Sequence, residues 1–347
     1  MSAGSATAAA GGAADPVLSA VDVRVRFAGR GRRRAAATAV DGVNLDIAPG
    51  EVVALVGESG CGKTTLARTL LGLERPTGGQ VRFAGRALSY RSGGLRSYRR
   101  NVQLVLQDPT GSLNPRHTVY EAVAEGVRIH RLDNEEARVA DALARCGLRP
   151  PERFFQRYPH ELSGGQRQRV VIAGALVLEP SVLVADEPVA SLDASVRGEI
   201  LSLLLRLRDQ LGLAAMVVTH DLGLAWNIAD RLAVMYLGRI VEVGTPEQVF
   251  ADPRHPYTRA LMSVLPESPI DPIVLTGEPP DPTRIPAGCR FHPRCPELAS
   301  GAAAAAGVAE RCTSVPLPVL PAAGPAQGQV ACHLAQARLA AGSAEAR

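Results

Sequence analysis

The sequence predicts an α/β protein with a parallel sheet, helices packed against it and a C-terminal extension of different character. Two observations lead to this prediction. Short apolar strands alternate with helical segments over most of the chain, which is typical of a parallel sheet covered by helices. After about residue 265 the chain is rich in proline and alanine and has few large apolar residues. A chain of 347 residues is long enough for a core domain with such an appendage.

Strand patterns dominate residues 18–90. Apolar and polar residues alternate over 18–27 and 40–47, as in half-buried strands. Residues 51–57 form a continuous apolar run of the kind that a fully buried strand shows. A helix is expected over 63–73, because its apolar spacing is helical and a Pro-Gly turn cluster follows it.

Helical spacing dominates residues 95–178, which we expect to be mainly helical. Short apolar strands return at 181–188 and 214–221, and a helix over 196–212 separates them. The return of strands after helices again favours a parallel sheet.

Charge and composition exclude several classes of protein. The net charge is +4, from 38 basic and 34 acidic residues, which is too small to indicate a nucleic-acid partner. The basic cluster at 29–34 is interpreted as a solvated loop. The sequence contains no run of about 18 apolar residues, so no membrane span is predicted. Residues 1–16 lack the pattern of a secretory signal and are predicted to be a disordered leader, so we expect a reducing cytosol and no structural disulfide.

A phosphate-binding loop is predicted at "GESGCGKTT" (57–65), which fits the pattern G-x-x-x-x-G-K-[ST] between a strand and a helix. The glycines let backbone N–H groups surround phosphate oxygens at a helix N-terminus. Lys63 would reach the β- and γ-phosphates, and the Thr64 hydroxyl would bind Mg²⁺. The predicted nucleotide-binding residues of the loop are Gly57, Glu58, Ser59, Gly60, Cys61, Gly62, Lys63, Thr64 and Thr65.

Two adjacent carboxylates end the apolar strand "SVLVADEP" (181–188). Ligands gather at the carboxyl ends of strands in open α/β sheets. Asp186 would hold the magnesium ion, and Glu187 would polarise an attacking water. Together with the loop, these residues indicate a nucleoside triphosphatase, and kinases, GTPases, helicases and transporters all remain open.

The stretch "LSGGQRQRV" (162–170) resembles the signature of the ATP-binding-cassette (ABC) superfamily. The other motifs of that superfamily follow in the expected order: the Q-loop in "LQDP", the D-loop "SLD" (191–193) and the switch in "VTHD". The resemblance implies a P-loop NTPase fold, the ABC cassette, with a RecA-like parallel-sheet core, an antiparallel β subdomain and a helical subdomain.

The resemblance also implies that the chain forms half of each composite site. In this superfamily two cassettes close head to tail, and ATP lies between the phosphate loop of one and the signature of the other. A helix N-terminus with free amides suits such a contact with the γ-phosphate. The signature residues that would serve the partner's ATP are Ser163, Gly164, Gly165 and Gln166.

The remaining roles are carried over position by position. Phe27 stands where the superfamily places an aromatic residue that stacks on adenine. Gln107 would contact Mg²⁺ and the attacking water, and Glu187 would be the general base. His220 would read the γ-phosphate, and Asp193 would form part of the dimer seam. The residues expected around Mg²⁺ are Thr64, Gln107 and Asp186.

Longer stretches, such as "VQLVLQDPTGSLNPRHTV" and "HPYTRALMSVLP", resemble the ATPase subunits of oligopeptide, dipeptide and nickel importers, more the F-type than the D-type. This resemblance implies ATP hydrolysis coupled to solute uptake at the cytoplasmic face of the membrane. It implies a second ATPase subunit (a heterodimer), two permeases, an extracytoplasmic solute-binding protein and no nucleic acid. Nickel or another small solute stays open as the cargo. A soluble ABC protein that acts on ribosomes or DNA, and an exporter's cassette, are the alternatives of other classes.

The chain is accordingly divided into segments. The expected divisions are a leader at 1–16, an ABC ATPase domain at 17–252 with its helical subdomain at about 95–178, an extension at 253–340 and a disordered tail at 341–347.

The cysteines divide into two groups. Cys61 is interpreted as a small filler in the phosphate loop and Cys146 as a core residue. The other thiols lie in a segment that is too poor in apolar residues to fold alone. We therefore expect a bound metal to stabilise this segment. Short zinc knuckles are missing, and a [4Fe–4S] cluster tolerates irregular spacing. The resemblance to peptide-importer ATPases implies such a cluster in the C-terminal extension, so we favour it over Zn²⁺, and both over unligated thiols. The predicted ligands are Cys289, Cys295, Cys312 and Cys332.

Overall fold

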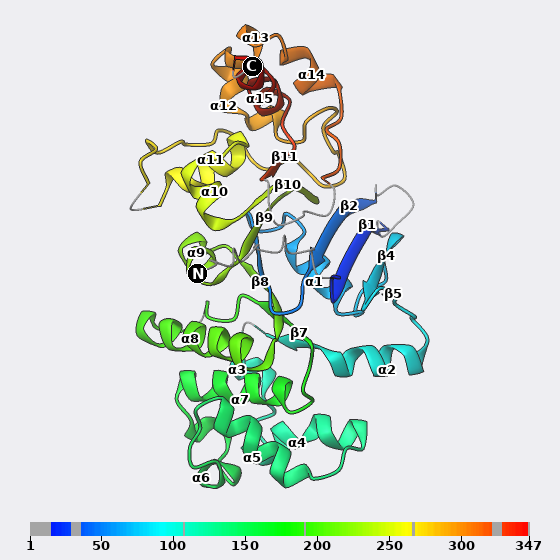
Figure 1. The fold of residues 1–347 in the computed structure, drawn as a ribbon, viewed down its shortest axis with the longest axis vertical. Helices are drawn as coiled ribbons and strands as arrows, with labels where there is room; N and C mark the ends of the chain where they lie inside the picture. Colours follow the sequence, from blue (N-terminus) through cyan, green and yellow to red (C-terminus); the bar gives the residue numbers. More distant parts are fainter. Residues whose placement is uncertain are drawn as a thin grey trace, which may run out of the picture.

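The structure is a computed structural model that describes residues 15–28, 36–106, 108–190, 192–265, 268–320 and 328–345. Residues 1–14 of the predicted leader, the basic segment 29–34 and Gln107 lie outside these ranges. Figure 1 shows the main sheet and the antiparallel sheet in the middle of the molecule, a group of helices at one end and the C-terminal extension at the other.

The strands of the described residues form two sheets. The antiparallel sheet has the order β2-β1-β4-β5, and the main sheet has the order β11-β10-β9-β3-β8-β7-β6. The antiparallel sheet comprises β1 (Leu18–Phe27), β2 (Ala37–Ile47), β4 (Gly78–Phe83) and β5 (Arg86–Ala87). The main sheet comprises β3 (Val52–Val56), β6 (Val102–Val105), β7 (Val182–Asp186), β8 (Ala214–Thr219), β9 (Arg231–Tyr236), β10 (Arg239–Gly244) and β11 (Gln329–Val330).

The centre of the main sheet is parallel, as the alternation of strands and helices predicts. β3 pairs with β8 on one side and β9 on the other, and all three run in the same direction. Every residue of β3 is buried, because helices and the second sheet cover both faces of it. β10 turns back against β9, so the sheet becomes antiparallel towards the extension. The parallel arrangement brings the carboxyl ends of β3 and β7 to one edge.

A group of helices beyond β6 has an apolar core of its own, which is continuous with one face of the main sheet. The interval 95–178 is not entirely helical, because β6 lies within it and pairs with β7. The helices from the phosphate loop to this group are α1 (Lys63–Leu70), α2 (Ser92–Asn101), α3 (Pro109–Ser112), α4 (Val119–His130), α5 (Glu135–Arg145), α6 (Glu152–Phe155), η1 (Pro159–Glu161) and α7 (Gly164–Leu176). Two further helices pack on the main sheet, α8 (Ala194–Leu211) and α9 (Leu222–Ile228).

The extension is more ordered than its composition predicts. Its own apolar cluster is small, but Phe291, Leu317 and Leu320 are buried in the main core. β11 adds an edge strand to the sheet by pairing with β10. Its other elements are α11 (Pro256–Ser263), η2 (His292–Arg294), α12 (Pro296–Ala299), α13 (Ala302–Ala305), α14 (Ala309–Ser314) and α15 (His333–Glu345), and α10 (Pro246–Ala251) precedes it.

The prediction of a disordered tail at 341–347 is wrong for the residues up to 345, which complete α15. This helix is rich in alanine, the residue with the highest helix propensity, so a segment with few core contacts still becomes helical. Residues 346–347 lie outside the described part of the chain.

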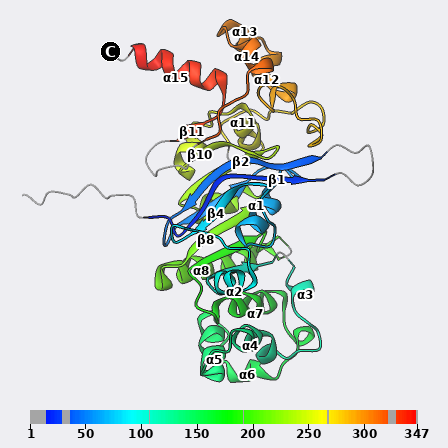
Figure 2. The same ribbon diagram turned by 90° about the vertical axis from the view of Figure 1, so that its right-hand side faces the viewer.

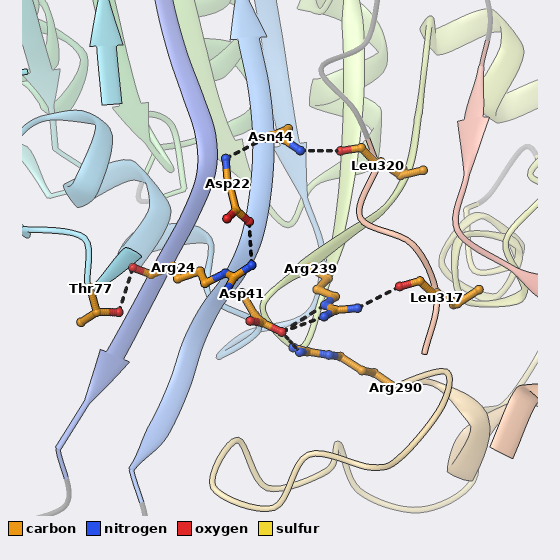
Figure 3. A network of polar contacts seen from close by, with 9 residues as sticks. All are labelled: Asp22, Arg24, Asp41, Asn44, Thr77, Arg239, Arg290, Leu317 and Leu320. Carbon is orange, nitrogen blue, oxygen red and sulfur yellow. Dashed lines mark hydrogen bonds and ion pairs between the residues drawn. The ribbon is translucent and has the colours of Figure 1, made fainter. Parts of the chain in front are cut away.

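Polar contacts also join the extension to the antiparallel sheet (Figure 3). Asp41 on β2 accepts hydrogen bonds from Arg239 on β10 and from Arg290 in the extension. Arg239 donates in turn to the carbonyl of Leu317 at 3.1 Å, and Asn44 donates to that of Leu320 at 3.2 Å. The two arginines hold the pKa of Asp41 below its ordinary value, although burial of the carboxyl opposes this. The extension is therefore attached to both sheets (Figure 2).

Candidate nucleotide-binding site

The predicted phosphate loop connects the end of β3 to the start of α1 and lies pressed against the backbone around it. Gly57 has φ +152°, and a Cβ there would lie 2.2 Å from the carbonyl oxygen of Met235. Gly62 has φ +109°, and its Cβ would lie 2.2 Å from the carbonyl oxygen of Ala39. Both positions therefore require glycine, for the backbone angle and for the space.

Lys63, the first residue of α1, is buried under this loop. Its ammonium group donates to the carbonyl oxygens of Gly57 at 2.7 Å and Glu58 at 2.9 Å. These bonds hold a positive charge next to a pocket of about 460 Å³. The pocket is lined by Ala39, Ser59, Gly60, Gly62, Lys63, Thr64, Thr65, Glu187 and His220.

Asp186 ends β7 beside the first turn of α1. Burial raises the pKa of its carboxyl above the ordinary value, and the charge of Glu187 adds to this effect. A hydrogen bond from the Thr64 hydroxyl and the charge of Lys63 act in the opposite direction. The hydroxyl and carboxylate oxygens of Thr64 and Asp186 are thus in contact, and such oxygens are the donors that Mg²⁺ prefers. These two residues fit a magnesium site.

Glu187 and His220 approach each other at the mouth of the same pocket. Nδ1 of His220 lies 2.9 Å from Oε1 of Glu187. The backbone of Glu187 has φ +48°, which is uncommon for a residue other than glycine, and its N–H donates to the carbonyl of Val218 at 2.8 Å. The strained backbone and this bond to β8 aim the carboxylate at the pocket. It is 21% exposed, whereas the imidazole is 64% exposed.

The signature lies at the start of α7, and Ser163 is its N-cap. The Ser163 hydroxyl accepts from the N–H of Gln166 at 3.2 Å, and the Gln166 side chain accepts from the N–H of Ser163 at 3.1 Å. This capping box fixes the turn. Ser163 and Gly164 are exposed, and none of the signature residues lines the pocket of the phosphate loop.

The other predicted site residues are placed as follows. Phe27 ends β1 with its ring 43% exposed, and it does not line the pocket. Asp193 is the exposed N-cap of α8. Gln107 lies outside the described residues. The structure thus brings together the loop, Asp186, Glu187 and His220, and it leaves Phe27, Asp193 and the signature apart from the pocket.

The structure also adds residues to the site that sequence patterns did not assign. Ala39 lines the pocket, since β2 passes beside the loop. Tyr257 and Arg294 contact Glu58 of the loop. Both residues stand in recognisable stretches, Tyr257 in "HPYTR" and Arg294 directly before Cys295. No local pattern in the sequence relates either of them to the phosphate loop.

The four cysteines of the extension are free thiols, and the other three influence Cys289 electrostatically. Burial, with the neighbouring Cys332, Cys295 and Cys312, raises the pKa of Cys289 to about 12. However, no group of three or more His, Cys, Asp or Glu side chains among the described residues is placed to hold a metal ion. The predicted ligand set is therefore not preformed here. Backbone N–H groups nearby act to lower the pKa of three of these thiols against the effect of burial: that of Phe291 on Cys289, those of Leu298 and Glu297 on Cys295, and those of Ala335 and Leu334 on Cys332.

Comparisons with known proteins agree with this geometry. Residues 40–190 match the family model "ABC transporter", and residues 241–300 match "Oligopeptide/dipeptide transporter, C-terminal region". The dipeptide transport ATP-binding protein of Haemophilus influenzae is 46% identical, over 74% of this chain and 80% of that protein. The chain belongs to the ABC transporter family. The Escherichia coli dipeptide transport ATP-binding protein is 44% identical over 81% of this chain and 86% of its own length.

Solved structures place the cassette in the same fold. CbiO1 of Clostridium perfringens, part of an ABC transporter complex, has a TM-score of 0.62 and 34% identity, covering 69% of this chain and 92% of its own. The ATP-binding cassette MJ0796, in a dimeric post-hydrolysis state bound to ADP and phosphate, has a TM-score of 0.58 and 29% identity, covering 66% and 98%. Among the described residues of this chain, no helix is long and apolar enough to cross a bilayer.

Proposed function

We propose that this chain is the ATP-hydrolysing motor subunit of an importer that takes up dipeptides or oligopeptides. The observation that carries the proposal is that one chain combines a phosphate-loop pocket, with Glu187 and His220 beside it, and the C-terminal region of peptide transporters. Relatives at 41–46% identity over most of the chain are named as dipeptide or oligopeptide transport ATP-binding proteins. The cassette would occupy 17–252 and the extension 253–340.

The site residues divide the reaction among them. Lys63 and the loop amides hold the β- and γ-phosphates of ATP. Glu187 takes a proton from water as the water oxygen attacks the γ-phosphorus. The bond from that phosphorus to the bridging oxygen breaks, and ADP and phosphate leave. His220 contacts the Glu187 carboxylate at 2.9 Å and would face the γ-phosphate. Mg²⁺ held by Thr64, Asp186 and Gln107 would neutralise charge on the phosphate oxygens.

A second cassette is needed to complete each site. The exposed Ser163 and the amides of Gly164 and Gly165 would bind the γ-phosphate of ATP held by the partner, and Asp193 would lie in the seam. Phe27 would stack on adenine from its exposed position at the end of β1. The proposed partners are a second ATPase subunit in a heterodimer, two permeases at the cytoplasmic face and an extracytoplasmic binding protein.

The test is reconstitution of the chain in proteoliposomes with the permeases, ATPase and binding protein encoded beside it. We expect peptide-loaded binding protein to stimulate ATP hydrolysis at least several-fold and to drive peptide uptake. Stimulation by nickel instead of peptide would change the cargo but keep the machinery. Co-purification of the chain with ribosomes or DNA, without any permease, would contradict the proposal.

The four cysteines of the extension are proposed to hold a [4Fe–4S] cluster, with Zn²⁺ as the alternative. The electrostatic coupling among these thiols and the backbone N–H groups that lower the pKa of three of them support this, since nearby N–H groups stabilise thiolate ligands. Because the thiols are not preformed as a ligand set, binding would draw them together. A brown, iron-containing anaerobic preparation is expected. Stoichiometric zinc would favour the alternative, and a preparation without either metal would contradict both.

A further inference from the structure

We propose that Arg294 and Tyr257 of the extension are positioning residues for the phosphate loop, through the single loop residue Glu58. By holding Glu58 they place the backbone to which Lys63 bonds and so set the affinity for ATP. The inference rests on the proposed ATPase function, and it assigns to the extension a direct part in nucleotide binding.

The first contact is an ion pair with two parallel bonds. Nη1 of Arg294 lies 2.9 Å from Oε2 of Glu58, and Nη2 lies 3.3 Å from Oε1. The Arg294 side chain is 8% exposed and that of Glu58 is 26% exposed. Bidentate pairs of this kind fix direction as well as distance, and partial burial protects them from screening by salt. Glu58 is therefore held at its side chain from the extension.

The second contact is made by the backbone of the same residue. The N–H of Glu58 donates to Oη of Tyr257 at 2.7 Å. Tyr257 is completely buried, and its ring packs against Tyr236 at 4.7 Å and Phe291 at 5.5 Å between ring centroids. A ring enclosed in this way cannot withdraw its oxygen, so the hydrogen bond fixes the peptide unit of Glu58. Phenylalanine would fill the same space but offer no acceptor.

The third contact connects Glu58 to the chemistry. Its carbonyl oxygen accepts from Nζ of Lys63 at 2.9 Å. One residue thus has its carboxylate bound to Arg294, its N–H to Tyr257 and its carbonyl to the lysine that reaches the phosphates. A shift of Glu58 would move a partner of Lys63, although neither extension residue lines the pocket.

A neighbouring contact supports the loop from the same segment. Arg290 donates to the carbonyl of Leu237, in the tight turn between β9 and β10. The next residue of that turn, Gly238, donates its N–H to the carbonyl of Cys61 at 2.8 Å. Arg290 and Arg294 lie between Cys289 and Cys295, so the cysteine-bearing turn reaches the loop by two routes. The position of that turn is therefore coupled to the position of the phosphate loop.

The test measures steady-state ATP hydrolysis by the reconstituted transporter that contains the full chain. Arg294→Met keeps the aliphatic stem and removes the ion pair, and Tyr257→Phe removes only the acceptor oxygen. We expect each variant to raise KM for ATP about tenfold, because a buried hydrogen bond lost at a fixed site usually has an effect of this size. The value of kcat should change by less than about twofold. Glu58→Gln should resemble Arg294→Met, and the double variant should be no worse than the worse single one, because both remove the same pair.

The matched control is Arg338→Met. Arg338 also pairs with a glutamate of the extension, Glu297 at 3.0 Å, but its own side chain is 57% exposed. It should leave KM and kcat unchanged. If Arg294→Met and Tyr257→Phe lower the melting temperature but leave KM at the wild-type value, the two residues only stabilise the fold and the proposal is wrong.

Two further measurements separate the possible failures. Should Arg294→Met fail to fold, Glu58→Gln and Tyr257→Phe carry the same test, since an unchanged KM in both would overturn the proposal. Binding of a fluorescent ATP analogue to the isolated chain should weaken in parallel with the rise in KM. A wild-type transporter without ATPase activity would contradict the proposed function itself, whereas normal wild-type activity with unaffected variants would contradict this inference alone.

Discussion

The phosphate loop and the signature are two helix N-termini of similar composition, yet the fold treats them in opposite ways. At the loop, a Cβ on Gly57 or Gly62 would lie 2.2 Å from a neighbouring carbonyl oxygen. At the signature, a Cβ on Gly164 would meet only the side chain of Leu192 at 3.6 Å. At Gly57 and Gly62 the loop is therefore enclosed by backbone, whereas the signature turn is exposed at Ser163 and Gly164 and is approached closely only by the Val196 side chain, at Gly165. The first arrangement suits a phosphate cradle, and the second leaves the cap open for the proposed contact with a second subunit.

The largest expected effect is on turnover, when Glu187 beside the phosphate loop is replaced. Glu187→Gln should reduce turnover about 10²- to 10⁴-fold, because the general base is lost while the cradle survives. ATP affinity, measured by equilibrium binding, should stay within about twofold. Hydrolysis at the wild-type rate would contradict the assignment of Glu187 as the base.

A matched pair of glycine variants tests the comparison directly. Gly57→Ala should weaken ATP binding by about 100-fold or unfold the loop, because the new methyl group meets backbone that cannot move aside. Gly164→Ala should leave ATP binding by the isolated chain unchanged, since its methyl group meets an ordinary van der Waals contact. Titration of both variants with ATP is the measurement. If both variants changed ATP affinity equally, the two turns would be enclosed to the same degree.

The signature side is tested by Ser163→Arg. A bulky side chain at the exposed cap should lower turnover of the assembled pair at least about tenfold, since Ser163 would serve the partner's ATP. Nucleotide binding by the isolated chain should be retained. Loss of that binding would mean that the signature acts within its own chain.

The smallest expected effect is on the melting temperature, when Asp186 is replaced. Burial raises the pKa of its carboxyl, so the folded chain holds the proton more tightly than the unfolded chain does. The penalty for ionisation is absent below the ordinary pKa of 3.8 and is complete above the raised value. Asp186→Asn should therefore raise the melting temperature of the nucleotide-free chain by about 1–3 °C at pH 7, and this gain should vanish towards pH 3. A gain that is independent of pH would rule out this cause.

Local patterns predict much of this molecule because the physics at those positions is local. The loop requires glycines and a lysine at a fixed spacing between a strand and a helix, and β3, α1 and β7 lie where the pattern places them. β9, β10 and β6 are harder to predict. β6 is a short strand within a mainly helical interval, and only its pairing with β7 identifies it as part of the sheet.

The extension, in contrast, is ordered by contacts that no local pattern records. Its composition predicts little apolar core, and its own cluster is indeed small. Its order comes from contacts with distant residues: β11 on β10, Phe291 in the main core and Arg294 on Glu58. The last pair joins positions 236 residues apart in the sequence, and no periodicity or spacing records such a partner.

The sequence by itself determined the parallel α/β core, the phosphate loop, the two carboxylates and the signature, because each depends on residue type and short-range spacing. Only the tertiary structure decided that Glu187 meets His220, that the signature stays exposed and that the extension holds the phosphate loop. Those facts depend on which surfaces meet when the chain folds. Burial and ion pairing between distant segments are properties of the packed molecule, so no single stretch of sequence contains them.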